Sequence, residues 1–252
     1  MIFGGASNTE TALRRVEHGR ASVGKFAQSW MDVFAYPFKG SGKYILPIGA
    51  VGLLLGKWLI AKANIQEVGS VWADPMCLVY LLAGMGPLGF ILLYLSDLIG
   101  TSAGEGAEPP VWPKIDRWTD AFRGVLVLLG PISVSFLPAI VYHLWQGDAN
   151  PWFRFALLAL GWLYCPMAIL GVVLWESAEG LSPLRVVPAI VKALPAYLLS
   201  LPAMPLLYLM SMVPARGVSG VAMAVPAMYL LMVMGRTLGV IYRTYAHRLK
   251  WF

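Results

Sequence analysis

Long apolar runs dominate the chain and alternate with short polar connections. Each run approaches the roughly 20 residues that a helix needs to cross the hydrocarbon core of a bilayer. We therefore predict an all-α fold, a polytopic membrane helix bundle of about six transmembrane helices. The predicted spans are 44–63, 76–95, 125–144, 155–175, 193–213 and 218–233.

The last two predicted spans are less regular than the first four. Proline removes a backbone N–H and kinks a helix, and the fifth run contains or adjoins Pro195, Pro202, Pro205 and Pro214. We expect the sixth span to continue as an interfacial helix through Tyr245.

Three polar connections contain an amphipathic segment that leads into a span. Their apolar positions are Phe26, Trp30 and Phe34; Ile115, Trp118, Phe122 and Val125; and Leu184, Val187 and Val191. Ser182 and Pro183 suit the N-cap and first turn of the third segment. Such segments are typical of helices that lie in the headgroup plane. We predict short amphipathic interfacial helices on the cytoplasmic face.

The distribution of Lys and Arg predicts the orientation of the bundle. Of 19 such residues, 15 fall on the side that holds both termini and four on the other. Because cations resist translocation, the rich side is expected to be cytoplasmic. We predict an integral protein of the bacterial cytoplasmic (inner) membrane with its N- and C-termini in the cytoplasm. Topology also explains the net charge of +6, so we expect membrane lipids rather than nucleic acid as partners.

Composition leaves little room for a soluble domain, since 58% of residues are hydrophobic and 13% charged. We divide the chain into a cytoplasmic N-terminal segment with an amphipathic helix (1–43), a six-span membrane domain (44–243) and a short basic cytoplasmic tail (244–252). The membrane domain includes a cytoplasmic loop at 97–124.

Aromatic and glycine residues mark two kinds of candidate site. The predicted membrane-interface residues are Phe26, Trp30, Phe34, Trp118, Phe122, Trp145 and Trp152. Aromatic side chains gather at that depth because their rings are amphipathic. The predicted helix-packing residues are Gly52, Gly56, Gly84 and Gly86, because small residues let membrane helices approach closely.

Polar residues that carry chemistry are scarce within the predicted spans. Asp97, Glu176 and Arg236 are placed at span ends, and His143 is the one histidine near the membrane. Asp97 and Glu176 would form a carboxylate pair if their spans touch; ordinary helix-end charges are the other interpretation. The nucleophile-elbow, zinc-protease and phosphate-loop motifs are absent. We predict no catalytic, metal or cofactor-binding residues and no enzymatic activity.

Three segments of the chain resemble the Yip-like integral membrane proteins, in particular their bacterial relatives. They are YPFKGSGKYILPIG at 36–49, LPAIV at 137–141 and GRTLGVIYRTYAHRL at 235–249. The resemblance implies a multi-pass helical fold. The aspartate-containing N-terminal signature of the eukaryotic members is absent, so their trafficking role is not implied.

Three functional hypotheses remain open at the level of sequence. The first is a non-enzymatic subunit or scaffold of a larger membrane complex, with other integral membrane subunits as partners. The second is a transporter or flippase for a lipid or small apolar solute, suggested by the proline-rich spans. The third is an accessory subunit of an electron-transfer or photosynthetic complex, suggested by the methionines near the C-terminus.

Overall fold

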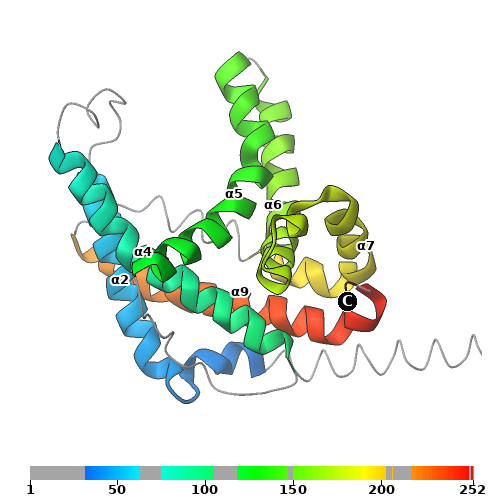
Figure 1. The fold of residues 1–252 in the computed structure, drawn as a ribbon, viewed down its shortest axis with the longest axis horizontal. Coiled ribbons are helices and arrows are strands. Elements are labelled where there is room, and N and C mark those ends of the chain that lie inside the picture. The colour runs from blue at the N-terminus through cyan, green and yellow to red at the C-terminus, as the bar shows by residue number, and fades with distance from the viewer. Residues whose placement is uncertain are drawn as a thin grey trace, which may run out of the picture.

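The structure, a computed structural model, describes residues 32–62, 75–104, 118–146, 150–202, 206, 217–249 and 251. The described part is helical and contains no strand. Its main helices are α2 (Gly42–Lys62), α4 (Pro75–Ala103), α5 (Trp118–Gln146), α6 (Pro151–Trp175), α7 (Pro183–Ser200) and α9 (Gly217–Leu249) (Figure 1). Two short 3-10 helices, η1 (Tyr36–Phe38) and η2 (Ala178–Leu181), precede α2 and α7.

Five of these helices are long and apolar enough to cross a membrane: α2, α4, α5, α6 and α9. The first four contain nearly all of the predicted spans 44–63, 76–95, 125–144 and 155–175. The all-α prediction is therefore confirmed for the described residues, and these helices agree with an integral membrane protein.

Two amphipathic segments are not separate helices. Positions from Trp118 onward form the first turns of α5, and α7 runs without a break from Pro183 to Ser200. α7 begins where expected, with Ser182 at its N-cap and Pro183 in its first turn. α7 therefore contains both the third amphipathic segment and the start of the predicted fifth span (193–213). Most of that span beyond Ser200 lies outside the described residues.

The segment after the predicted sixth span, expected to continue as an interfacial helix through Tyr245, belongs to the same continuous helix as the span. α9 continues unbroken to Leu249, and every residue from Met232 to Ile241 is buried. A helix that is apolar and buried on all sides lies in the core of a bundle rather than at its surface. α9 extends from the side of α2 and α4 to the side of α7 (Figure 1).

Glycines bring α2 and α4 together. A Cβ atom at Gly56 would lie 3.1 Å from the carbonyl oxygen of Gly84, and one at Gly84 would lie 3.1 Å from that of Gly56. One turn earlier in α2, Gly52 faces Ile91. Gly86 is half-buried on α4. Close backbone contact of this kind is what small residues supply in membrane helices.

The contact between α4 and α9 is closer still. A Cβ at Gly239 would overlap that of Ser102 and lie 2.8 Å from the carbonyl oxygen of Ile99. Gly235, one turn earlier, faces the side chains of Leu95 and Leu98. Because residue numbers rise together along both helices, α9 runs in the same direction as α4.

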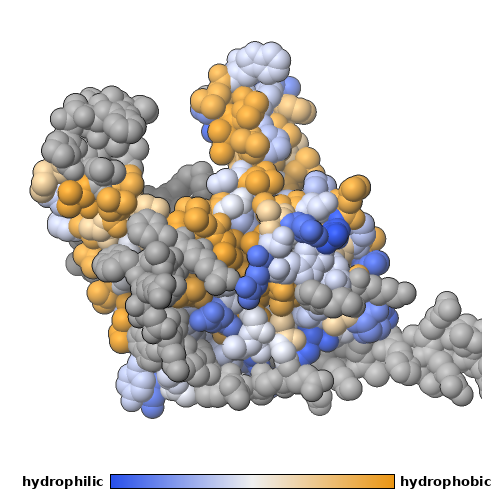
Figure 2. All heavy atoms as spheres, in the orientation of Figure 1, coloured by the Kyte–Doolittle hydropathy of each residue, from blue (hydrophilic) through white to orange (hydrophobic). Residues whose placement is uncertain are grey.

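α5 and α6 form an antiparallel hairpin that projects from the rest of the molecule (Figure 1). Gly161 of α6 packs on Phe136 of α5, and the rings of Tyr142 and Phe153 meet near the tip at 4.9 Å. The buried residues of α6 run from Gly161 onward, whereas its first ten residues contribute none. Hydrophobic residues form most of the visible face of the projecting part below its tip (Figure 2).

A substitution at Gly239 tests the close packing between α4 and α9 directly. We expect Gly239→Ala to lower the free energy of unfolding by about 2 kcal/mol, because the added methyl group cannot fit against the α4 backbone. Gly100→Ala on α4 is the matched control, since nothing in the described part of the protein lies within 4 Å of the position of a Cβ atom there. Reversible unfolding in detergent micelles measures both; equal effects of the two substitutions would contradict the packing.

Candidate functional site

The predicted interface residues fall into three groups. Phe34 is exposed just before η1, and Trp145 and Trp152 lie together at the tip of the α5–α6 hairpin with 84% and 81% of their surface exposed. Trp118 and Phe122 belong to α5, but their side chains lie outside the described part. Phe26 and Trp30 lie outside the described residues.

The most polar part of the buried core surrounds Arg236. This residue was expected at the end of a span, but it lies within the buried stretch of α9 and is only 6% exposed. Its Nη1 donates a hydrogen bond to the Ser102 hydroxyl of α4 at 2.9 Å. Its guanidinium carbon lies 4.5 Å from the centre of the Tyr36 ring.

This arrangement compensates part of the cost of burying a charge. An unpaired cation in a low-dielectric interior is strongly disfavoured, and both a hydroxyl acceptor and an aromatic face reduce that cost. The Tyr36 side chain belongs to η1 and is itself buried. Arg236 therefore joins the segment before α2, the end of α4 and the middle of α9.

Further contacts hold η1 on α9. The Tyr229 hydroxyl donates to the carbonyl oxygen of Phe34 at 3.0 Å, and the Tyr229 and Phe38 rings lie 5.7 Å apart. At the surface, Lys39 forms an ion pair with Asp32 at 2.9 Å. That hydrogen bond and the charge of Lys39 hold the pKa of the Asp32 carboxyl below its ordinary value, whereas burial raises the pKa of Tyr36.

The carboxylates considered from the sequence lie at the surface. Asp97 is exposed near the end of α4, and Glu176 is exposed in the left-handed conformation that ends α6. Among the described residues, no group of three or more His, Cys, Asp and Glu side chains could hold a metal ion.

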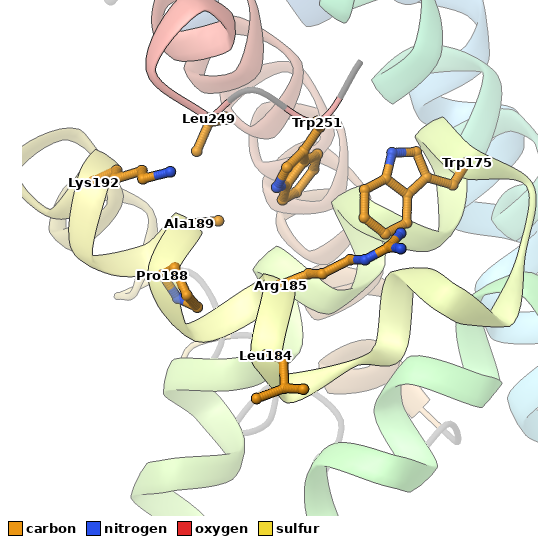
Figure 3. A pocket seen from close by; sticks show the side chains of 8 residues that line it. All are labelled: Trp175, Leu184, Arg185, Pro188, Ala189, Lys192, Leu249 and Trp251. Carbon is orange, nitrogen blue, oxygen red and sulfur yellow. The ribbon is translucent and has the colours of Figure 1, made fainter.

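A second polar feature is a pocket between α7, the end of α6 and the segment after α9 (Figure 3). Its volume is about 400 Å³. It is lined by Trp175, Leu184, Arg185, Pro188, Ala189, Lys192, Leu249 and Trp251. The described residues that line it thus include two cations and two indole rings and no acidic side chain.

Aromatic contacts shape this pocket. The Trp175 and Trp251 rings lie 5.4 Å apart, and the Arg185 guanidinium lies 4.4 Å from the Trp175 ring centre. Arg185 also forms an ion pair with Glu179 of η2 at 2.9 Å, with both side chains at least half exposed. Lys192 extends its amine toward the space between α7 and Trp251 (Figure 3).

Sequence reasoning found neither feature as a site. Arg236 was missed because a single cation near the end of an apolar run usually marks the end of a membrane span. Its contacts with Ser102 and Tyr36, which place it inside the bundle, depend on the tertiary structure. The pocket unites residues from three separate segments. Its one visible signal was the amphipathic pattern around Arg185 and Lys192, which indicated a surface helix.

Comparisons of the chain with protein-family models, with curated proteins and with solved structures found no match. The Yip-like resemblance therefore stays a prediction. Two of its segments, 36–49 and 235–249, meet in the fold through Arg236 and Tyr36.

The hydrogen bond between Arg236 and Ser102 can be tested with a double-mutant cycle. We expect Ser102→Ala to cost about 2 kcal/mol of unfolding free energy, because it leaves a buried guanidinium N–H without its acceptor. In an Arg236→Met background the same substitution should cost little, since that donor is gone. Equal costs in the two backgrounds, measured by reversible unfolding in micelles, would contradict the interaction.

Proposed function

We propose that the chain is a non-enzymatic integral membrane subunit that holds partner transmembrane helices in a larger complex of the bacterial cytoplasmic membrane. Support comes from how the packing is distributed. The core gathers around α9, whereas the projecting α5–α6 hairpin presents apolar side chains that no other described part of the chain covers (Figure 2).

The observation that carries the proposal is one face of α5. Leu126 and Leu137 are exposed at 72% and 53%, and the exposed Ser133 lies between them on the same face near mid-span. Gly130 belongs to this face, and none of the described residues lies within 4 Å of the position of a Cβ atom there. Small residues at such a face allow a second helix to approach closely, and a serine hydroxyl can bond across the contact.

The other two hypotheses have less support. The pocket beside α7 lies at the end of α6, not at mid-span where a transported solute would bind. The methionines that suggested a redox or pigment role include Met228, Met232 and Met234, which are buried. Met228 packs on Gly49 of α2, as expected of a flexible core residue.

We further propose that the chain crosses the membrane six times and that both termini are cytoplasmic. Four crossings by α2, α4, α5 and α6 return the chain to its starting side at Trp175. Trp251, beyond α9, lies against Trp175. The remainder of the chain therefore crosses twice or not at all, and two crossings agree with the asymmetric distribution of Lys and Arg.

The scaffold proposal is tested by substitution of the open face. We expect Gly130→Leu to lower co-purification of a stoichiometric membrane partner about tenfold in mild detergent, because a bulky side chain prevents close helix contact. Gly100→Leu on α4 is the control, since it adds the same side chain at another open position. Wild-type protein that purifies only as a monodisperse monomer, or equal loss with both variants, would overturn the proposal.

A further inference from the structure

The pocket beside α7 has the composition of an anion site. Arg185 and Lys192 stand two turns apart on one face of α7, and both line the pocket with Trp175 and Trp251. Its volume of about 400 Å³ exceeds what a water molecule needs. The described lining residues include these two cations and no carboxylate, although the ion pair with Glu179 offsets part of the charge of Arg185.

The chemistry of these two cations suits a phosphate group. A guanidinium offers a rigid fork of N–H donors, and an ammonium adds a compact charge. The Trp175 ring lies against Arg185 and restricts its conformations before a ligand arrives. Glu179 shares the guanidinium, but exposed ion pairs of this kind contribute little and exchange readily.

The surroundings of the pocket favour a phosphate that is attached to a lipid. Leu184 lines the pocket and is 86% exposed. It begins an exposed apolar stripe along α7 that continues through Val187, Val191, Leu194 and Leu198. A phospholipid bound with its headgroup between Arg185 and Lys192 could lay an acyl chain along this stripe, which begins at Leu184.

We propose that this pocket binds the phosphate of an anionic phospholipid headgroup. Basic pockets between membrane helices are suited to such headgroups. A soluble phosphate ester shares the same recognition chemistry and is the alternative source. Alternatively, the two cations stabilise the nearby C-terminal ends of α6 and α9 through the helix dipoles. In that case, their removal lowers the stability of the protein and leaves lipid binding unchanged.

Native mass spectrometry of the full chain in mild detergent tests the proposal. The probes are dioleoyl phosphatidylglycerol, the zwitterionic dioleoyl phosphatidylcholine, and glycerol 3-phosphate as the soluble ester. We expect wild-type protein to retain phosphatidylglycerol in preference to both others. The double variant Arg185→Gln/Lys192→Gln should bind it about tenfold more weakly, as loss of charge-assisted hydrogen bonds predicts.

The matched control is Lys43→Gln/Lys62→Gln, which removes two exposed cations that also lie over aromatic rings. Equal weakening by both double variants would show attraction by net charge alone and overturn the proposal. Unchanged binding by the pocket variant would overturn it as well. Equally tight binding of glycerol 3-phosphate would support the phosphate chemistry but overturn the lipid as its source.

Two single variants keep the test informative if the double variant does not fold. Lys192→Gln leaves the ion pair between Arg185 and Glu179 intact, and should weaken phosphatidylglycerol binding several-fold. Glu179→Gln should strengthen it, because the carboxylate no longer competes for Arg185. Weaker binding by Glu179→Gln would contradict the assigned role of the guanidinium.

Discussion

Two glycines of α9 leave room for α4 to lie directly against the α9 backbone, which a side chain at either position would prevent. Gly235 and Gly239 lie against Leu95, Ile99 and Ser102, and the rest of the core is arranged around this contact. It sets the direction of α9, buries that helix on all sides from Met232 to Ile241, and brings Arg236 within hydrogen-bond distance of Ser102. In a bilayer, where apolar burial between helices gains little, close packing of this kind is the main source of association.

The placement of charge follows from the same contact. A cation inside an apolar bundle needs partners, and Arg236 finds them in a hydroxyl of α4 and the ring of Tyr36. η1 is thereby held on the bundle before α2 begins. The cations of α7 are arranged differently, because Arg185 and Lys192 line an accessible pocket. One cation thus supports the fold, whereas the other two are placed for an external anion.

The sequence predicted those parts of the fold that depend on local composition. Apolar length identified α2, α4, α5 and α6, and the Ser182–Pro183 pair marked the start of α7. The contact between Gly56 and Gly84 depends on α2 packing against α4. The spacing of glycines along the sequence does not reveal which helices pack together. Composition also could not distinguish a buried C-terminal helix from an interfacial one, because Arg236, Arg243 and Arg248 make the sequence of α9 look polar. Contacts with Ser102 of α4 and Tyr36 of η1 allow Arg236 to be buried all the same.

The proposed topology places the two described ends of the chain on one side of the membrane and takes the last third of the chain across the membrane twice. Accessibility of single cysteines to a membrane-impermeant maleimide, introduced after replacement of Cys77 and Cys165, tests this directly. We predict that cysteines at Ser41, Ser177 and Arg248 react from the cytoplasmic side, and that cysteines at Asn150 and Arg216 react only from the opposite side. Labelling of a cysteine at position 248 from the side opposite to position 41, or of one at position 216 from the same side as position 41, would contradict six spans.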